Sequence, residues 1–191
     1  PEAEPEQQIT AEEYWDQAHD HWEANDLEEA IKDFQNVLKL DSKNSVAHYK
    51  IGSIYREMND YKKAVQEFSK AINLDPDNSK FYDVRAEVKF QLFDSRGCIQ
   101  DCDMAISLDS TKARPYTNRG AAKSDLKLYN EAISDFNRAI ELDPNAGIAY
   151  YNLGFIYQEL GNMDSACENY SKAGELGVNK AYDDIKKYCF N

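Results

Sequence analysis

The feature that most constrains the fold is a 34-residue period that recurs along nearly the whole chain. Four landmarks of one segment return two periods later, as the pairs Ala64 and Ala132, Phe68 and Phe136, Ala71 and Ala139, and Pro76 and Pro144. Counted from Ala11, the period gives five repeats with no insertion or deletion: 11–44, 45–78, 79–112, 113–146 and 147–180. Because a fixed period of this size indicates stacked copies of one structural element, the sequence predicts a solenoid.

Each repeat carries the signals of two helices joined by a short turn. A first helix of about 14 residues is followed by a turn and by a second helix that runs to a Leu-Asp-Pro or Leu-Asp-Ser corner. Pro76 and Pro144 end the second helix because the proline ring removes a donor and clashes with the preceding turn. Turn residues stand between the two helices at Asn25-Asp26, Asn59-Asp60, Asp94 and Gly161-Asn162.

The landmarks resemble those of the tetratricopeptide repeat (TPR) family. The second repeat has Gly52, Tyr55, Ala64, Phe68, Ala71 and Pro76, and the fourth has Tyr116, Gly120, Ala132, Phe136, Ala139 and Pro144. The fifth has Tyr150, Leu153, Gly154, Tyr157, Ala166, Tyr170 and Ala173, with Val178 in the place of the proline. The first and third depart further, with Ser42, Ser110, Cys98 and Cys102 at landmark positions. Over residues 11–180 the resemblance implies an all-α, right-handed superhelical solenoid of antiparallel helix pairs, and the segment 166–189 resembles bacterial members.

The two ends of the chain differ from the repeats. Residues 1–10 are rich in Glu and Pro, so we expect a flexible acidic lead-in. Thr10 and Glu13 form the pattern of a capping box, which predicts that the first helix starts directly after Thr10. Residues 181–191 carry an apolar stripe of Ala181, Ile185, Tyr188 and Cys189, which predicts a capping helix.

Charge limits the classes of partner. Asp and Glu number 35 against 22 Lys and Arg, a formal net charge of −13, so nucleic acid and anionic membranes are disfavoured. No apolar run approaches the roughly 20 residues that span a bilayer, so membrane insertion is not expected. The chain begins at Pro1, which suggests a fragment or a processed form. We expect a cytoplasmic protein and leave an exported or periplasmic form open.

Two repeats pair an arginine with an aspartate at a constant separation. The pairs are Arg85 with Asp101 and Arg119 with Asp135, whereas repeats with Ile51 or Leu153 at the arginine position have Glu67 or Asn169 at the aspartate position. In an antiparallel helix pair this separation places the two side chains opposite one another, which predicts structural ion pairs.

No catalytic constellation, phosphate-binding loop or cofactor motif is present, so the sequence predicts a protein that is not an enzyme. Asp16, His19, Asp20 and Glu23 share one helix face, a pattern that suits zinc but is more often a solvated face, and no metal site is expected. The cysteines Cys98, Cys102, Cys167 and Cys189 are interpreted first as packed thiols, although Cys167 and Cys189 could be bridged in an oxidising compartment.

The resemblance also implies a binding surface, because the second, fifth, sixth and ninth residues of each repeat in this family tend to face a concave groove. Peptide-binding candidates on that surface are Tyr49, Lys50, Lys80, Arg114, Asn118, Tyr151, Asn152 and Phe155. Lys50, Lys80 and Arg114 could receive a carboxylate, Asn118 and Asn152 could hold a peptide main chain, and the aromatic residues with Ile148 could anchor apolar groups.

The carboxylate clamp of the chaperone-binding subclass is absent in every register tested, so binding to chaperone C-terminal tails is disfavoured. For example, the register that begins at the first repeat gives Trp15, His19, Lys50, Lys80 and Val84 in the clamp positions. The sequence therefore predicts a non-enzymatic protein-interaction scaffold that binds an extended peptide or partner helix. Two alternatives stay open: a repeat module of a larger enzyme or a secretion or assembly complex, and a self-associating structural protein.

Overall fold

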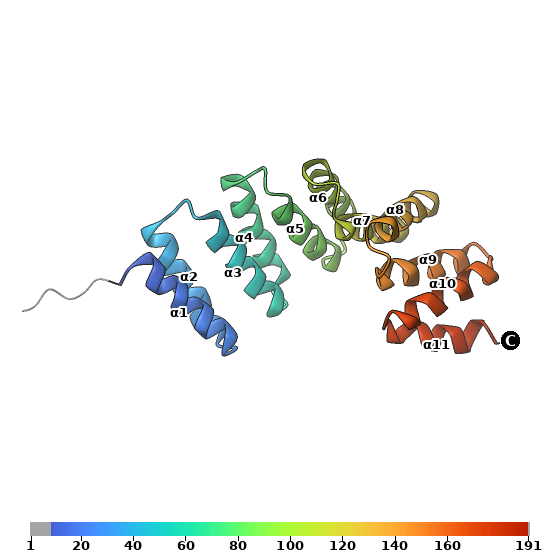
Figure 1. Ribbon diagram of the computed structural model, residues 1–191. Helices are drawn as coiled ribbons and strands as arrows, with labels where there is room; N and C mark the ends of the chain where they lie inside the picture. Colours follow the sequence, from blue (N-terminus) through green and yellow to red (C-terminus); the bar gives the residue numbers. More distant parts are fainter. Residues whose placement is uncertain (1–8, 191) are drawn as a thin grey trace, which may run out of the picture. The chain divides into compact units, whose positions relative to one another are not determined.

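A computed structural model describes residues 9–190 (Figure 1), and in this part of the chain every regular element is a helix. The helices are α1 (Ala11–Glu23), α2 (Leu27–Leu40), α3 (Ser45–Glu57), α4 (Tyr61–Leu74), α5 (Ser79–Gln91), α6 (Ser95–Leu108), α7 (Ala113–Asp125), α8 (Tyr129–Leu142), α9 (Gly147–Glu159), α10 (Met163–Glu175) and α11 (Asn179–Tyr188). The predicted all-α helical repeat is confirmed. Of the predicted lead-in, residues 1–8 lie outside the described residues.

The helices keep the 34-residue period of the sequence. The first helices α1, α3, α5, α7 and α9 start one period apart, and so do the second helices α2, α4, α6, α8 and α10. The chain divides into two compact units, residues 1–81 and 82–191, with the boundary inside α5. The division into five repeats and a capping helix stays our proposal.

Side-chain caps fix several helix starts. Thr10 and Glu13 form the predicted capping box, in which the Glu13 N–H donates to Thr10 Oγ1 at 3.2 Å and the Thr10 N–H donates to Glu13 Oε2 at 2.7 Å. Four further helices begin with a side-chain oxygen that accepts from the backbone, at Asn44, Asp60, Asp94 and Asn162.

The turn between the first and second helix of each pair has one geometry throughout. Its residue with positive φ is Asn25, Asn59, Phe93, Lys127 or Gly161, again one period apart. The next N–H donates to the carbonyl five residues earlier, for example Asp60 to Tyr55 at 2.8 Å and Asp94 to Lys89 at 2.9 Å. This is a Schellman closure, which favours Gly or Asn at the left-handed position. Phe93 is the poorest fit, since it has a φ of 60° and an aromatic side chain.

Close contact between paired helices depends on a missing side chain. A Cβ added to Gly52 would meet the Phe68 ring at 2.7 Å, one on Gly120 would meet Phe136 at 2.9 Å, and one on Gly154 would meet Tyr170 at 2.6 Å. All three rings are buried. In the α3–α4, α7–α8 and α9–α10 pairs, the aromatic landmark of the second helix therefore packs directly on the backbone of the first helix.

The predicted ion pairs are confirmed. Arg85 donates to both carboxylate oxygens of Asp101 at 2.8 and 2.7 Å, and Arg119 donates to both oxygens of Asp135 at 3.0 and 2.6 Å. Both aspartates are buried. A second cation reaches each carboxylate, Lys89 at Asp101 and Lys123 at Asp135, in both cases at 2.8 Å. The lysines were not foreseen from the sequence.

The last helix starts early. At the end of α10, the Val178 N–H donates to Ala173 O at 2.9 Å and Gly177 has a φ of 87°, so a Schellman closure replaces the proline corner. As a result α11 begins at Asn179, two residues before the predicted start of the capping helix at residue 181.

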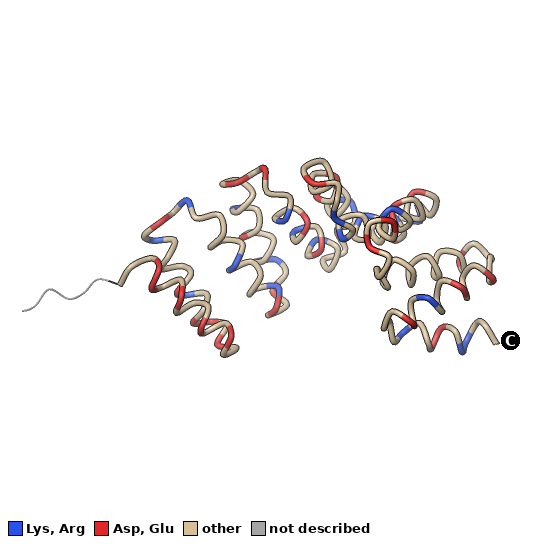
Figure 2. Tube along the Cα trace, in the orientation of Figure 1, with Lys and Arg blue, Asp and Glu red and all other residues tan. Residues whose placement is uncertain are grey.

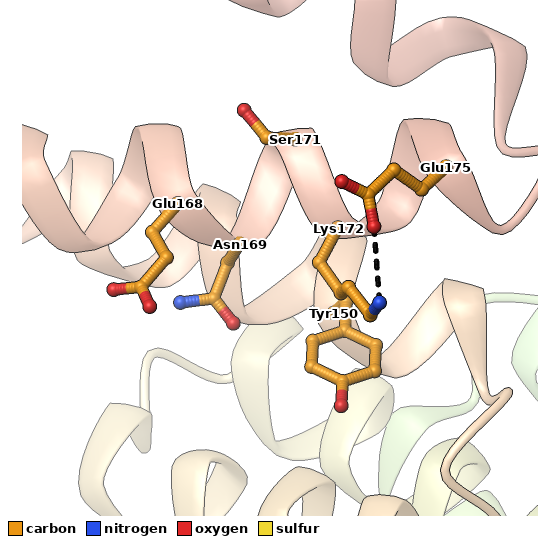
Figure 3. Close-up of a pocket in the computed structure, with 6 residues that line it drawn as sticks. All are labelled: Tyr150, Glu168, Asn169, Ser171, Lys172 and Glu175. Atoms are coloured by element: carbon orange, nitrogen blue, oxygen red, sulfur yellow. Dashed lines mark hydrogen bonds and ion pairs between the residues drawn. The ribbon is translucent and has the colours of Figure 1, made fainter.

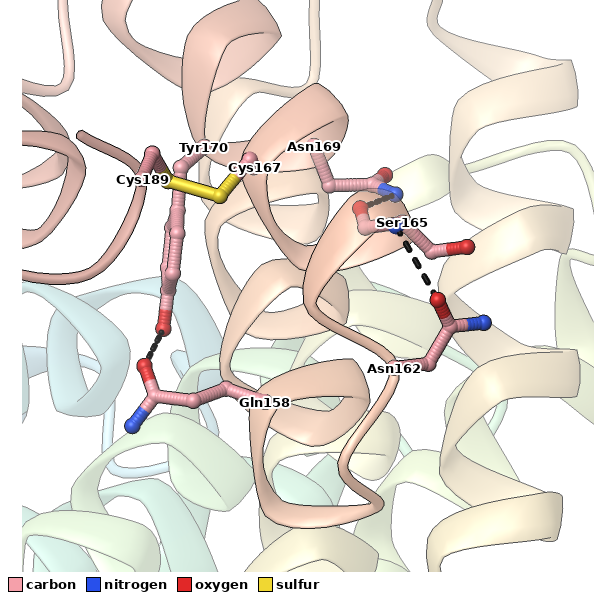
Figure 4. The surroundings of a disulfide bond; sticks show 7 residues. All are labelled: Gln158, Asn162, Ser165, Cys167, Asn169, Tyr170 and Cys189. Atoms are coloured by element: carbon pink, nitrogen blue, oxygen red, sulfur yellow. Dashed lines mark hydrogen bonds between the residues drawn. A yellow bond between two sulfur atoms is a disulfide. The ribbon is translucent and has the colours of Figure 1, made fainter. Parts of the chain in front are cut away.

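A disulfide between Cys167 and Cys189 joins α10 to the residue that follows α11 (Figure 4). The Cα atoms are 5.7 Å apart. The preferred interpretation of these two cysteines as packed thiols is therefore wrong, because the end of α11 lies close enough to α10 for a disulfide. Beside the disulfide, the Tyr170 hydroxyl donates to Gln158 Oε1 at 2.8 Å. Cys98 and Cys102 are buried and free, as expected.

Candidate functional site

The candidate site is the face of the first helices, and in the first compact unit its cations lie on aromatic rings. Lys50 Nζ lies 5.2 Å from the centroid of the Trp22 ring, and Lys80 Nζ lies 4.7 Å from that of Tyr49. Tyr49 in turn stacks on Phe81, with ring centroids 5.4 Å apart. Each of the two lysines thus lies over an aromatic ring, Lys50 from α3 and Lys80 from the start of α5.

In the second compact unit, Arg114 and Asn118 meet at one carboxylate. Arg114 Nε donates to Asp83 Oδ2 at 2.7 Å, and Asn118 Nδ2 donates to Asp83 Oδ1 at 3.3 Å. Arg114 also lies 3.8 Å from Glu87. Burial raises the pKa of Asp83 above its ordinary value, although Arg114 acts in the opposite direction. The charge of Arg114 is therefore already compensated within the protein.

The three remaining candidates lie on α9. The Tyr151 hydroxyl donates to Asp184 Oδ2 of α11 at 2.8 Å, and burial together with this carboxylate raises the pKa of Tyr151. Asn152 Nδ2 donates to Ile148 O at 3.0 Å, within its own helix. Phe155 is 39% exposed and Ile148 is 55% exposed, so both present apolar surface to solvent.

Three of these contacts follow one rule that sequence reasoning missed. At the start of α5, α7 and α11, the second residue of the helix lies against the fifth residue of the first helix before it. The instances are Lys80 on Tyr49, Arg114 on Asp83 and Lys180 on Tyr151, the last at 5.4 Å from the ring centroid. The sequence pattern that could have predicted these contacts is a Lys or Arg at the start of one helix and an aromatic or acidic residue in the first helix of the repeat before it.

A hollow of about 480 Å³ lies over the N-terminal parts of α7 and α9. Its lining includes Arg114, Thr117 and Asn118 of α7, Ile148 of α9, Glu87 of α5, and Asp143 and Asn145 of the α8–α9 turn. The structure thus places two of the predicted site residues, Arg114 and Asn118, at one hollow, with Ile148 beside them. Tyr151, Asn152 and Phe155 are not part of its lining.

The zinc-like cluster on α1 has another explanation. His19 Nδ1 donates to Trp15 O at 2.9 Å, and its ring packs edge-on against Phe34 at 5.4 Å. Across residues 9–190 no group of three or more His, Cys, Asp or Glu side chains is placed to hold a metal ion. Asp and Glu residues are spread along the chain, and α1 has no Lys or Arg (Figure 2).

In the described part of the chain, every helix is too short or too polar to cross a membrane. The hydrogen bond to Cys98, together with burial, raises the pKa of the Cys102 thiol, so this thiol is not activated as a nucleophile.

Comparison with solved structures shows the fold in other proteins. YrrB, described as a TPR protein with an unusual peptide-binding site, is 26% identical with a TM-score of 0.76, covering 93% of this chain and 92% of YrrB. MamA from Desulfovibrio magneticus RS-1 is 20% identical with a TM-score of 0.81, covering 87% and 94%. PilW, described as a widely conserved type IV pilus biogenesis factor, is 18% identical with a TM-score of 0.77, covering 89% and 79%.

Family models agree with this fold. Tetratricopeptide repeat models match residues 21–88, 124–161 and 148–176. No curated protein matches the chain. With the matched segments, the periodic spacing of the helices and the glycine–aromatic packing together, the chain belongs to the tetratricopeptide repeat family.

Proposed function

We propose that the chain is a non-catalytic protein-interaction scaffold that binds an extended peptide on the first helices of its second compact unit. The observation that carries the proposal is the hollow of about 480 Å³ over α7 and α9, because it combines an exposed aliphatic side chain with amide groups. Ile148 supplies the apolar contact. Asn118 and Asn145 supply groups that can donate to and accept from a peptide backbone.

The charges around the hollow favour a neutral or basic peptide over an acidic one. Arg114 is held by Asp83 and Glu87, and Asp143 adds a further negative charge to the lining. A peptide carboxylate would have to displace Asp83 from Arg114, which would leave a buried carboxylate with Asn118 but without its charged partner. A lysine or arginine on the peptide would meet Glu87 and Asp143 instead.

Apolar contacts extend the proposed surface along α9. Phe155 is exposed, and Asn152 lies one helical turn after Ile148, so a peptide that leaves the hollow along α9 would pass both. In the first compact unit, Tyr49, Lys50 and Lys80 form the equivalent surface, which we propose as a second contact region of the same kind.

YrrB offers support from outside the chain, because its description as a TPR protein with a peptide-binding site matches the function proposed here at 26% identity over nearly the whole length. The pilus biogenesis factor PilW shares the fold at 18% identity. A place in a secretion or assembly complex is therefore a setting that the scaffold function would suit.

The experiment is selection of a random dodecapeptide library on the intact chain, followed by measurement of the affinity of each enriched peptide. Replacing Ile148 with Asp should weaken binding by roughly tenfold or more, since it puts a charge where an apolar contact is proposed. Asn118→Ala should weaken binding several-fold. Asn137→Ala, on the exposed face of α8, is the matched control and should leave affinity unchanged. Enriched peptides that bind the Ile148 variant and the control equally well would refute the proposed site.

The disulfide between Cys167 and Cys189 supports a proposal about the cellular compartment in which the chain functions. Disulfides persist in oxidising compartments and are rare in the cytosol. With Cys167 and Cys189 bridged, we infer that the chain functions in an exported or periplasmic setting. Its thiol content, measured by alkylation after isolation from its natural source, should show two free cysteines; four would overturn this inference.

A further inference from the structure

The helix pairs share an acid–base contact at one position. The seventh residue of each second helix from α2 to α8 is acidic, and a base from the first helix binds it. The contacts are His21 with Asp33, His48 with Glu67, Arg85 and Lys89 with Asp101, and Arg119 and Lys123 with Asp135. A buried or half-buried carboxylate needs such a partner, so this position is a base-binding site that the protein normally fills itself.

In two pairs the base is an arginine that also lies over a tyrosine. The guanidinium of Arg85 lies 5.8 Å from the centroid of the Tyr82 ring, and that of Arg119 lies 5.5 Å from that of Tyr116. Each tyrosine is the fourth residue of its first helix and each arginine the seventh. The α5–α6 and α7–α8 pairs thus show the same arrangement, a guanidinium between a tyrosine ring and an acceptor on the second helix.

The α9–α10 pair keeps the tyrosine and the acceptor but has no arginine. Tyr150, Leu153 and Asn169 stand at the equivalent positions. Leu153 is turned into the core and is only 3% exposed. A hollow of about 570 Å³ is lined by Tyr150, Asn169, Glu168, Ser171, Lys172 and Glu175 (Figure 3). The two positions that contact the arginine in the other pairs, here Tyr150 and Asn169, therefore line an open hollow.

Acceptors for a cation are available in this hollow. Figure 3 shows the side chains of Glu168, Asn169 and Lys172 directed from α10 toward the side on which Tyr150 lies, while Ser171 points away. Within the described residues Glu168 has no hydrogen-bond or ion-pair partner, whereas Lys172 is bound to Glu175 at 3.0 Å. Asn169 Nδ2 donates to Ser165 O at 2.8 Å, which leaves Oδ1 as an acceptor. Two carboxylates against one ammonium give the lining a single net negative charge.

We propose that this hollow binds an arginine side chain of a partner protein, with the guanidinium over Tyr150 and hydrogen-bonded to Glu168 and Asn169. A guanidinium fits better than an ammonium, because its planar fork can donate to two acceptors while its face covers the ring. The site shares no lining residue with the hollow over α7 and α9, so it goes beyond the proposed peptide binding and each can fail without the other.

The test is a nuclear magnetic resonance titration of the ¹⁵N-labelled full chain with acetyl-arginine amide, which mimics an arginine within a polypeptide. Acetyl-citrulline amide is the neutral comparator of the same shape, and acetyl-lysine amide is the cationic one. The arginine probe should give saturable shifts at the backbone amides of residues 168–172. The citrulline probe should bind roughly tenfold more weakly, since it lacks the charge, and the lysine probe should bind several-fold more weakly.

Variants of the chain distinguish specific binding of the arginine probe in this hollow from non-specific attraction of a cation to an acidic protein. Glu168→Gln should weaken the arginine probe by roughly tenfold, and Asp183→Asn, an exposed change of equal charge on α11, should leave its affinity unchanged. Leu153→Arg combined with Asn169→Asp should abolish binding by filling the hollow from within. Because this double variant changes the core, its helix content is checked by circular dichroism, and the surface variant Glu168→Gln tests the site without it.

Three results with the capped probes and the variants would overturn the proposal: no saturable shift at residues 168–172, equal binding of the citrulline or lysine probe, or equal effects of the Glu168 and Asp183 variants. Free L-arginine is a further arm of the titration. Tighter binding of the free amino acid than of the capped amide would assign the hollow to a small metabolite and refute a partner protein.

Discussion

Arg119 holds the buried carboxylate of Asp135 through two hydrogen bonds, 3.0 Å from Nε and 2.6 Å from Nη2. Lys123 reaches the same carboxylate at 2.8 Å, and Arg119 also binds Asp103 at 2.6 Å. Despite burial, these carboxylates raise the pKa of Arg119 above its ordinary value. The pair is thus the centre of a small network that joins α7 to α8 and to α6.

The two side chains should be energetically coupled. Arg119→Leu should destabilise the protein by about 2–4 kcal/mol, because Asp135 keeps only Lys123 as a partner. Adding Asp135→Leu should recover part of that loss, so the double-mutant cycle should give a coupling of about 1–3 kcal/mol in urea unfolding. Additive effects of the two substitutions would contradict the network.

Phe93 should be replaceable with a gain in stability. It has a φ of 60° and is 91% exposed, so its side chain strains the backbone without burying surface. Phe93→Gly should stabilise the protein by about 1 kcal/mol, since a left-handed conformation costs other residues about 1–2 kcal/mol. Asn59→Gly, at the equivalent turn, should change little because Asn tolerates this conformation. A loss of stability in Phe93→Gly would contradict the assignment of strain to this turn.

Reduction of the disulfide should loosen α11. Bridging residues separated by 22 positions removes loop entropy worth about 3 kcal/mol from the unfolded chain. Cys189→Ser should therefore lower the thermal midpoint and speed hydrogen exchange in α11, and a reducing agent should do the same to the unmodified protein. The variant itself should not respond to the reducing agent, because Cys98 and Cys102 are already free.

Stability should depend on pH through Glu67. Burial raises the pKa of Glu67, but hydrogen bonds from His48 and Lys70 outweigh it, and the net result is a pKa below the ordinary 4.5. A carboxylate with a lowered pKa contributes stability above the unfolded-state pKa and loses it as the pH falls through the folded-state value. Glu67→Gln should thus cost about 1–2 kcal/mol at pH near 7 and much less at about pH 2.5 in urea unfolding. An equal cost at both pH values would contradict this account.

The sequence was sufficient to predict the helix pairs because their determinants are local and repeated. Phe68 and Gly52 recur at a fixed distance, and so do Arg119 and Asp135 with their counterparts, which makes both contacts readable without coordinates. The disulfide was harder to predict. It forms across a corner that departs from the repeat, because Gly177 ends α10 with a positive φ and α11 starts two residues before the period of the first helices would place it.

The candidate site was less predictable, because the identity of a residue does not determine which neighbouring group its side chain binds. Arg114 has the charge to bind a carboxylate ligand, but Asp83 lies within hydrogen-bonding distance and takes that role. Tyr151 has the ring to anchor a peptide, but its hydroxyl is used by Asp184. The only sign of the hollow beside Tyr150 in the sequence is Leu153, which stands where two other repeats have arginine.

The early start of α11 determines where further repeats would have to be fused to this chain. Lys180 occupies the same helical position as Lys80, so α11 already behaves as the opening helix of a further hairpin, but it begins two residues sooner after α9 than the period of the other first helices would place it. A fused segment should therefore be counted from Asn179. If the fused segment is placed on the regular period instead, it is displaced by two residues. Its apolar stripe is then rotated by about 200° around the helix axis and faces water.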